Sequence, residues 1–419
     1  MIPTGMQLTD EEVQKVGIVA SSLAQAACVA GIENGRCQRC QQRSLVALPD
    51  GRQYCSACLT MGRVTSRTKL YRFPSGPSEG GTLTWSGTLT GPQAAAAAAA
   101  IASVTAGRDH LLWAVTGAGK TEMLFPLIAH ELGNRKRVAV ATPRIDVVLE
   151  LAPRLQAAFE GTPVAVLYGG AEWPAQPAAL TVATTHQLLR YYRHFDLIIV
   201  DEVDAFPYSQ TPMLAAAVAQ ANRGPTVYLS ATPPKALQRA VRRHQIGVSY
   251  LTRRFHGFAL PLPTLVVLPL KQVPKRLSPK LSRLLQAAVQ GRQCLLFVPR
   301  IDWLAPLAAA LNTQGLRVQT AHAEDPARVA TVQAFRAGEF DVLITTTILE
   351  RGVTIPRCSV LVLAADDRQF SASGLIQMAG RAGRSQASPN DPVWFVARHI
   401  TKAMLSARHQ IHALNAVGS

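Results

Sequence analysis

The chain has 419 residues, enough for two or three domains at roughly 150 residues each. Its 43 Lys and Arg residues outnumber its 26 Asp and Glu residues, so the net charge is +17, and this dispersed positive charge favours a polyanionic partner. The sequence contains neither a run of eighteen strongly apolar residues nor a signal-peptide pattern, which argues against a membrane-spanning or secreted protein and predicts a cytoplasmic location.

An N-terminal segment over residues 1–33 precedes a cysteine-rich module expected at residues 34–75. Tetrahedral zinc takes four thiolates, and each CxxC turn presents two of them on one side of a tight loop. The spacing therefore predicts a zinc-ribbon-like module that binds Zn²⁺, with an iron–sulfur cluster as the less favoured alternative. The predicted ligands stand in two CxxC pairs separated by fourteen residues: Cys37 with Cys40, and Cys55 with Cys58.

A first lobe is expected over residues 76–254. Seven consecutive alanines at residues 94–100 predict a helix of small residues packed closely on a neighbour. From residue 111 onward, short runs rich in β-branched residues alternate with longer helical patterns, which is typical of stacked βαβ units with a parallel sheet. The predicted strands of this lobe are residues 111–115, 137–142, 164–168, 180–184, 197–200 and 227–230.

Residues 114–121, Ala-Val-Thr-Gly-Ala-Gly-Lys-Thr, follow the first of these strands and precede a helical run. Small residues let backbone N–H groups curl around phosphate, a lysine reaches the β and γ oxygens, and a hydroxyl binds Mg²⁺. This P-loop pattern predicts an ATP site, with Ala114 in place of the usual leading glycine. The predicted nucleotide-binding residues are Thr116, Gly117, Ala118, Gly119, Lys120 and Thr121.

An acidic pair, Asp201 and Glu202, follows the apolar strand at residues 197–200. Acidic side chains at the carboxyl end of a central parallel strand fall beside a P-loop. Asp201 is expected to hold Mg²⁺ through water, and Glu202 is expected to orient and deprotonate the attacking water. Taken alone, such a pair is usually a solvated loop end, and the P-loop upstream favours the catalytic interpretation.

The second half of the chain repeats the βαβ pattern over residues 255–419. Five prolines within residues 258–279 predict a connector and an edge strand, with the boundary between lobes near Arg254. Arg381 and Arg384 have the reach and fixed charge of arginine fingers, although a basic surface turn is the alternative. The predicted strands here are residues 265–268, 294–298, 318–321, 342–346, 360–363 and 393–397.

Asp201-Glu-Val-Asp204 resembles the DEAD/DEAH box of superfamily 2 helicases, and other segments resemble the remaining motifs of that superfamily in order. The resemblance implies two tandem RecA-like lobes. It also implies that Gln93 reads adenine, that Gly352 and Gln377 close on ATP from the second lobe, and that residues 230–232 couple hydrolysis to lobe movement. The matching segments are residues 89–93, 142–144, 184–185, 201–204, 230–232, 346–352 and 377–384.

Contacts to the sugar-phosphate chain of single-stranded DNA are expected from hydroxyl and guanidinium groups in these motifs, without dependence on base sequence. For each threonine, helix capping is the alternative role. The candidate DNA-binding residues are Thr142, Arg144, Thr184, Thr185, Arg300 and Thr346.

Cysteine pairs placed ahead of a motor with a DEVD box resemble the late-competence ComFA family. The resemblance implies an ATP hydrolase that drives single-stranded DNA uptake in natural competence. It would act in the cytoplasm or at the inner face of the membrane, with the uptake channel and other competence proteins as partners. A PriA-like replication-restart helicase and a DNA-dependent ATPase that switches without translocating are the alternatives. Duplex unwinding and single-strand translocation both fit this pattern.

Overall fold

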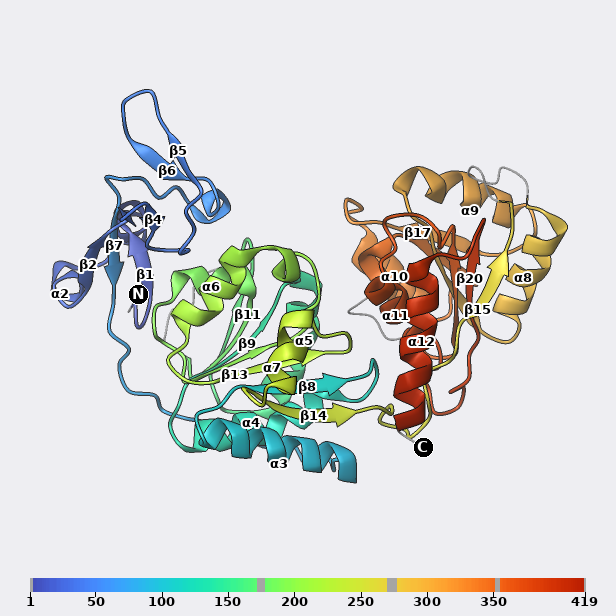
Figure 1. The fold of residues 1–419 in the computed structure, drawn as a ribbon, viewed down its shortest axis with the longest axis horizontal. Helices are drawn as coiled ribbons and strands as arrows, with labels where there is room; N and C mark the ends of the chain where they lie inside the picture. Colours follow the sequence, from blue (N-terminus) through green and yellow to red (C-terminus); the bar gives the residue numbers. More distant parts are fainter. Residues whose placement is uncertain (1–2, 172–177, 270–276, 351–354, 418–419) are drawn as a thin grey trace. The chain divides into compact units, whose positions relative to one another are not determined.

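The computed structural model describes residues 3–171, 178–269, 277–350 and 355–417. The chain divides into two compact units, residues 1–114 with 120–251 and residues 115–119 with 252–419 (Figure 1). Each unit is built around one parallel sheet, which confirms the predicted α/β class with two parallel-sheet lobes. The division falls between residues 251 and 252, close to the boundary expected at residue 254.

An N-terminal module, residues 3–73, contains a three-stranded antiparallel sheet in the order β1-β7-β2. Leu8 lies opposite Tyr71, so strands far apart in the sequence close the module. The segment expected at residues 1–33 and the cysteine module expected at residues 34–75 therefore share one sheet. The elements are β1 (Gln7–Thr9), α1 (Asp10–Val16), α2 (Ala20–Leu23), β2 (Ala27–Ala30), β3 (Ile32–Glu33), β4 (Arg36–Cys37), β5 (Leu45–Ala47), β6 (Gln53–Cys55), the 3₁₀ helix η1 (Leu59–Met61) and β7 (Lys69–Arg72).

The first lobe has a seven-stranded parallel sheet in the order β10-β11-β9-β12-β13-β8-β14. The six predicted strands are present, and β14, a short strand at the edge beside β8, was not predicted. Its sequence Gly-Val-Ser-Tyr-Leu has weak β-branched character, and pairing with β8 decides its conformation. The strands are β8 (His110–Ala114), β9 (Val138–Thr142), β10 (Val164–Leu167), β11 (Leu180–Thr184), β12 (Leu197–Val200), β13 (Thr226–Ser230) and β14 (Gly247–Leu251).

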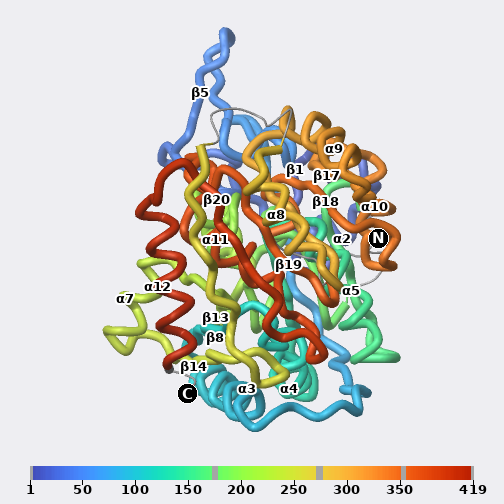
Figure 2. The backbone as a smooth tube through the Cα atoms, turned by 90° about the vertical axis from the view of Figure 1, so that its right-hand side faces the viewer, coloured from blue at the N-terminus to red at the C-terminus, as the bar shows by residue number. Residues whose placement is uncertain are grey.

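Helices cover both faces of this sheet. The alanine-rich helix α3 packs along α4 and against β14 and β8, with Ala96, Ala97 and Ala100 buried, as predicted for a helix of small residues (Figures 1 and 2). On the opposite side, α6 covers a core shared with η2. The helices are α3 (Gly91–Thr105), α4 (Lys120–Gly133), α5 (Ile145–Ala158), η2 (Thr185–Arg190), η3 (Tyr208–Gln210), α6 (Pro212–Ala221) and α7 (Lys235–Arg242).

The N-terminal module packs directly on the first lobe around η2. The Gln7 Nε2 group donates a hydrogen bond to the Leu189 carbonyl at 3.0 Å, and Glu12 pairs with Arg190 at 3.1 Å. One continuous apolar core joins the two parts, because buried residues of the module pack with residues of β9, β12 and α6. These core residues include Met6, Leu8, Met61, Val64, Ala139, Phe195, Ile198, Met213 and Leu214.

The second lobe has a six-stranded parallel sheet in the order β15-β20-β19-β16-β18-β17, so β15 is the predicted edge strand. Leucines of α8 and α9 pack on this sheet. None of the described helices, here or in the first unit, has the length and hydrophobicity to cross a membrane. The elements are β15 (Thr264–Val267), α8 (Pro279–Val289), β16 (Gln293–Phe297), η4 (Ile301–Trp303), α9 (Leu304–Asn312), β17 (Val318–Ala321), α10 (Arg328–Arg336), β18 (Val342–Thr345), η5 (Thr347–Glu350), β19 (Cys358–Leu363), α11 (Ala372–Ala379), β20 (Val393–Ala397) and α12 (Lys402–Val417).

Candidate ATP site, cysteine centre and DNA-contacting residues

The P-loop connects the carboxyl end of β8 to the amino end of α4. Gly117 and Gly119 have φ values of 82° and 73°, a left-handed conformation that glycine adopts without steric cost. Lys120 is the first residue of α4, and Thr121 is 9% exposed in its first turn. Backbone N–H groups and the helix dipole at such a terminus favour bound phosphate. The local fold therefore suits the phosphate-binding role predicted for residues 116–121.

The acidic box begins directly after β12, the central strand of the first sheet. The Asp201 amide donates a hydrogen bond to the Ala141 carbonyl at 2.8 Å, which ties the box to neighbouring β9. Asp201 Oδ1 accepts the Glu202 amide at 2.8 Å, and Glu202 has a φ of 56°. A non-glycine residue in this conformation is held by its surroundings and is common at functional sites. Because β13 alone separates β12 from β8, the box and the P-loop leave the same edge of the sheet.

Asp204, the last residue of the box, contacts Ser230 at the end of β13 and Thr232 just after it. Its carboxylate accepts hydrogen bonds from the Ser230 hydroxyl at 2.6 Å and the Thr232 hydroxyl at 2.7 Å. The Thr232 amide in turn donates to Ser230 Oγ at 2.9 Å. Sequence resemblance marked residues 230–232 as a coupling segment, but it did not identify Asp204 as the group that they bond.

Gln93 lies in the first turn of α3 and is 5% exposed. Its Oε1 accepts hydrogen bonds from the Thr90 amide at 2.9 Å and from the Thr90 hydroxyl at 3.0 Å. This capping box gives Gln93 a structural role at the start of α3. Adenine recognition by Gln93 stays a prediction. Gly352, also predicted to bind nucleotide, lies outside the described residues.

The three second-lobe residues predicted to act on ATP lie on or just after α11. Gln377 is 3% exposed within α11, and Arg381 is 4% exposed just beyond it. Arg381 Nε donates to the Glu350 carbonyl at 2.9 Å, and Arg384 Nε donates to the Gly380 carbonyl at 3.0 Å. Backbone contacts therefore fix the directions of both guanidinium groups.

Arg254 is a buried arginine that sequence reasoning used only as a boundary. It is 2% exposed, and its Nη1 donates a hydrogen bond to the carbonyl of Gly383, which lies between Arg381 and Arg384. Its Nε and Nη2 have no hydrogen-bond partner among the described residues. Burial, followed by the charge of Arg381, lowers the pKa of Arg254 to about 10. The adjacent Phe255 amide donates to the Gly117 carbonyl at 3.0 Å.

Three of the threonines predicted to contact DNA lie on or next to adjacent strands of the first sheet. Thr142 ends β9 and Thr184 ends β11, and the two residues are register partners. The hydroxyls of Thr142 and Thr185 are buried without a hydrogen-bond partner among the described residues. Thr184 occupies the N-cap position of η2, but its side chain makes no capping hydrogen bond. The capping alternative therefore does not apply to Thr184.

The other predicted DNA contacts belong to loops at the carboxyl ends of strands. Arg144 is the N-cap residue of α5, and its guanidinium lies 3.7 Å from Asp146. In the second lobe, Arg300 precedes η4 and pairs with Asp302 at 3.3 Å, while Thr346 follows β18. DNA binding by all six residues stays a prediction.

The four cysteines of the CxxC pairs gather in one buried cluster. Their sulfur atoms all lie within 4.8 Å of one another, and each residue is 0% exposed. Cys37 Sγ lies 3.8 Å from Cys58 Sγ, and Cys40 Sγ lies 3.5 Å from Cys55 Sγ. Sulfur ligands of tetrahedral zinc lie about 3.8 Å apart when each bond is about 2.3 Å. The donor set and its spacing therefore fit Zn²⁺. Hydrogen bonds from Cys37 and Cys40 lower the pKa of Cys58, whereas hydrogen bonds within the cluster raise the pKa of Cys40, so they favour the thiolate at only some of the four sulfur atoms.

Arg39, inside the first CxxC pair, is a buried cation that sequence reasoning missed. It is 2% exposed, and its guanidinium donates to the carbonyls of Met61 at 2.8 Å and Cys58 at 3.0 Å, and to that of Gly62. Burial lowers the pKa of Arg39, but the charge and hydrogen bonding of Cys58 outweigh it, so the net pKa is raised. A fixed positive charge therefore stands beside the thiolates. A basic residue inside a CxxC pair is the signal that could have found it.

Two family models match the chain, DEAD/DEAH box helicase over residues 94–240 and helicase conserved C-terminal domain over residues 278–386. Competence protein ComFA of Bacillus subtilis (strain 168) is 42% identical over 395 residues, which cover 91% of this chain and 85% of that protein. The chain belongs to the ComFA family. Another ComFA, from Streptococcus pneumoniae (strain ATCC BAA-255 / R6), is 39% identical and covers 98% of this chain and 96% of that protein. The resemblance drawn from the sequence is confirmed.

With these matches, this member of the ComFA family is an ATP-hydrolysing enzyme of the helicase type. Its fold is similar to that of S. cerevisiae Dbp5 bound to RNA and ADP BeF3. The TM-score is 0.57 at 16% identity, over 78% of this chain and 88% of that one. At this identity the likeness concerns the fold alone, and it agrees with two RecA-like lobes.

Proposed function

We propose that this chain is an ATP-driven translocase that moves single-stranded DNA during uptake in natural competence. The carrying observation is the similarity of 42% and 39% identity to two competence proteins ComFA, which extends over 91% and 98% of the chain. Similarity of that extent includes the cysteine module as well as both lobes. The similarity to ComFA therefore covers the cysteine module and both lobes, whereas the two helicase family models match residues of the two lobes alone.

In this proposal the first lobe binds the phosphates of ATP. Lys120 contacts the β and γ oxygens, and the hydroxyl of Thr121 and the carboxylate of Asp201 hold Mg²⁺. When bound, Mg²⁺ neutralises charge that develops on the phosphate oxygens. Glu202 orients the attacking water and takes its proton. The left-handed backbone at Gly117, Gly119 and Glu202 supports this arrangement, because it places amides and a carboxylate at one edge of the sheet.

The second lobe supplies positive charge to the transition state. Arg381 and Arg384 are held by backbone carbonyls, so little side-chain entropy is lost when they meet the phosphoryl group. Because these arginines and the acidic box stand on separate lobes, hydrolysis requires the lobes to close on ATP. A single strand of DNA that favours the closed form would then stimulate hydrolysis.

DNA is expected to be held through its phosphates. The hydroxyls of Thr142 and Thr185 are buried at the carboxyl ends of neighbouring strands and have no hydrogen-bond partner in the described part of the chain, which supports a polar ligand at that edge. Arg144, Arg300 and Thr346 would extend the contacts. Phosphate contacts carry no base specificity, so binding should be independent of sequence and should weaken with salt.

A translocation assay on labelled single strands of both polarities tests the proposal. ATP consumed and distance travelled are measured together, with a blunt duplex as the control substrate. Directional movement with ATP use coupled to distance supports a translocase. Hydrolysis that DNA stimulates without any travel would support the switch instead, and unwinding of the duplex control would support a replication-restart type of helicase.

The cell location belongs to the same proposal. We infer that the motor acts in the cytoplasm at the inner face of the membrane, where it would receive the strand from the DNA-uptake channel. The +17 charge suits both the DNA and an anionic membrane surface. Fractionation of competent cells, with and without the channel, checks this location. If the protein is recovered with the membrane fraction equally well from cells that lack the channel, a direct association with the channel is contradicted.

A further inference from the structure

A groove of about 840 Å³ lies between the N-terminal module and α6, and none of the predicted ATP-site residues that the structure describes lines it. Asp109 and Thr226, at the amino ends of β8 and β13, form part of its wall. The P-loop follows the opposite end of β8, so this strand's five residues place about 16 Å between the groove and the ATP site. The polar, charged and aromatic residues that line the groove include Gln38, Arg72, Tyr192, Arg193, Gln220 and Asn222.

The first CxxC pair builds one wall of this groove. The Gln38 carbonyl accepts hydrogen bonds from Arg72 Nη2 at 2.9 Å and from Gln220 Nε2 at 3.1 Å. The loop that carries two of the four thiols is thereby tied both to β7 and to α6. Arg72 also lies over the ring of Tyr192, with 3.9 Å from its guanidinium carbon to the ring centroid. The groove is therefore built from fixed side chains of two parts of the chain.

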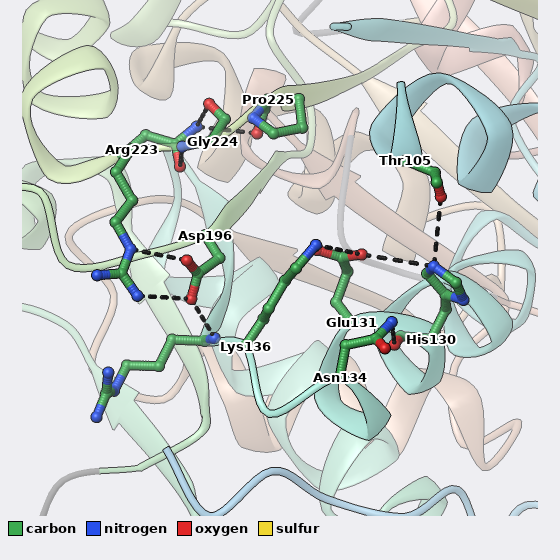
Figure 3. Close-up of polar contacts among 11 residues, drawn as sticks. Thr105, His130, Glu131, Asn134, Lys136, Asp196, Arg223, Gly224 and Pro225 are labelled. Atoms are coloured by element: carbon green, nitrogen blue, oxygen red, sulfur yellow. Dashed lines mark hydrogen bonds and ion pairs between the residues drawn. The ribbon is translucent and has the colours of Figure 1, made fainter. Parts of the chain in front are cut away.

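Positive charge in the groove is only partly neutralised. Arg223 is held by Asp196 at 2.7 and 3.1 Å, so that pair contributes little net charge (Figure 3). Arg72 and Arg193 form no ion pair with any described acidic residue. Asp109, the acidic residue of the wall, accepts the Thr226 amide at 2.8 Å. Among the described residues, the groove thus offers two guanidinium groups without an ion-pair partner against one lining carboxylate, and the charge of Glu33 acts on Arg72 from outside the lining.

Arg193 is placed for contact with a ligand. Its side chain is exposed, while its backbone amide donates to the Gln220 carbonyl at 2.7 Å. Its φ of 46° is uncommon for a residue with a Cβ and is maintained by this anchorage. The fixed backbone holds this exposed arginine at the groove.

We propose that this groove binds a short segment of single-stranded nucleic acid at a second site, remote from the ATP site. Guanidinium groups suit phosphates, and tyrosine rings and guanidinium planes suit exposed base faces. Gln220 Oε1, buried without a hydrogen-bond partner among the described residues, can accept from a base edge. A duplex presents no free base faces to the tyrosine rings, and an acidic peptide would leave those rings without a role. The inference rests on the proposed function in one respect, namely that nucleic acid is what the motor acts on.

With this second site, the cysteine centre would help to retain single-stranded nucleic acid near the motor. A metal that fixes the first CxxC loop would keep Gln38 and its neighbours in the groove wall. A strand held there stays close to the motor when the motor releases it, because a tethered strand rebinds at a raised effective concentration.

The test compares Arg193→Ala with Arg135→Ala. Arg135 is also exposed, also left-handed with a φ of 55°, and lies outside the groove, so the two substitutions carry the same backbone cost. Binding of fluorescent oligodeoxythymidylate is measured over a range of salt. Each lost contact to a single-strand phosphate should make the slope of log affinity against log salt less steep by about 0.7. We expect that change for Arg193→Ala and none for Arg135→Ala, and equal slopes for both variants and the unmodified protein would overturn the proposal.

A second measurement locates the contact directly. The unmodified protein is photo-crosslinked to oligodeoxythymidylate that carries 4-thiothymidine, and the attached peptides are identified. Attachment within residues 36–43 or 190–194 supports the groove, and attachment confined to the motor motifs overturns it. Displacement of crosslinks at the groove by polyglutamate, with binding elsewhere unaffected, would point to an acidic peptide and also overturn it. An ATPase that single strands fail to stimulate would contradict the translocase alone, because the slope and the crosslinks are read without ATP.

Discussion

The hydroxyl of Thr232 donates a hydrogen bond to Asp204 Oδ2 at 2.7 Å, and the Ser230 hydroxyl donates to Oδ1 of the same carboxylate at 2.6 Å. Both bonds have a charged acceptor, and such bonds are stronger than bonds between neutral groups. They connect the acidic box after β12 to the segment after β13. We therefore expect a shift of the box during hydrolysis to move residues 230–232.

Thr232→Val removes the donor and keeps the side-chain shape. We expect ATP hydrolysis to continue and the distance travelled per ATP to fall, with a loss in the free energy of unfolding of about 1.5–3 kcal/mol. Parallel measurement of ATP use and strand travel checks this. Ser230→Ala should behave in the same way, because it breaks the other bond to the same carboxylate. Normal coupling in both variants would assign these bonds a purely structural role.

Lys120→Ala should abolish ATP hydrolysis and leave single-stranded DNA binding largely intact. In the proposed mechanism this lysine, at the start of α4, binds the phosphates of ATP and contributes little to DNA binding. Hydrolysis and fluorescence anisotropy on the same preparation check the separation. Lys235→Ala is the matched control, since Lys235 is an exposed lysine that also opens a helix of this lobe. Equal loss of both activities in the Lys120 variant would contradict distinct sites.

Arg384→Ala should lower the DNA-stimulated rate on the order of a thousandfold with little change in ATP affinity. An arginine that meets charge developing in the transition state contributes to the rate more than to ground-state binding. Single-turnover hydrolysis and nucleotide binding measure the two quantities. Arg283→Ala, an exposed arginine on α8, is the control. A fast ATPase in the Arg384 variant would remove the arginine-finger assignment.

The cysteine centre should hold one zinc ion per chain. Cys58→Ser should release it and unfold the N-terminal module locally, while the second lobe keeps its structure, because metal binding and folding of such a small module are coupled. Metal analysis and limited proteolysis check this. Cys28→Ser provides the control, since Cys28 is an exposed cysteine outside the cluster. Iron in place of zinc, or zinc retained by the Cys58 variant, would contradict the assignment.

Acid should destabilise the first lobe through His110. The ring of this residue, 1% exposed, bonds to Ser103 at 2.8 Å and Ser249 at 3.0 Å. Burial, and secondarily the charge of Arg108, lowers the pKa of His110 from 6.5 to about 4. The unfolded chain therefore takes up a proton first as the pH falls. Stability should decrease between pH 6.5 and about 4, by up to about 3 kcal/mol, and this group adds no further loss at lower pH.

Urea unfolding at neutral pH and near pH 4 measures this dependence. His110→Gln should lower stability at neutral pH and make it less dependent on pH across that window. His194, whose pKa burial lowers to about 3, leaves a residual dependence in the variant. An unchanged slope with pH in His110→Gln would show that other groups control acid unfolding.

Local spacing was sufficient for much of the candidate site. The P-loop, the Asp201–Glu202 pair and the two CxxC pairs are each defined by neighbouring residues, so residue type and order are enough to predict a chemistry for them. The position of Gln93 was also apparent, but its Oε1 is used in a cap with Thr90, a competition that a motif does not reveal. Arg254 was not recognised, because nothing in the sequence indicates that this arginine is buried. Arg39 was also missed, although its place inside a CxxC pair is a signal that could have found it.

The sequence by itself determined the two parallel sheets, because β-branched runs of suitable length form strands wherever helices can cover them. The tertiary structure alone decided which distant segments meet. Gln7 reaches the Leu189 carbonyl across 182 residues, and Gln220 reaches the Gln38 carbonyl across another 182. Contacts of this kind depend on packing between separately formed elements, which no local pattern records. The groove beside Arg193 exists only because those elements pack together.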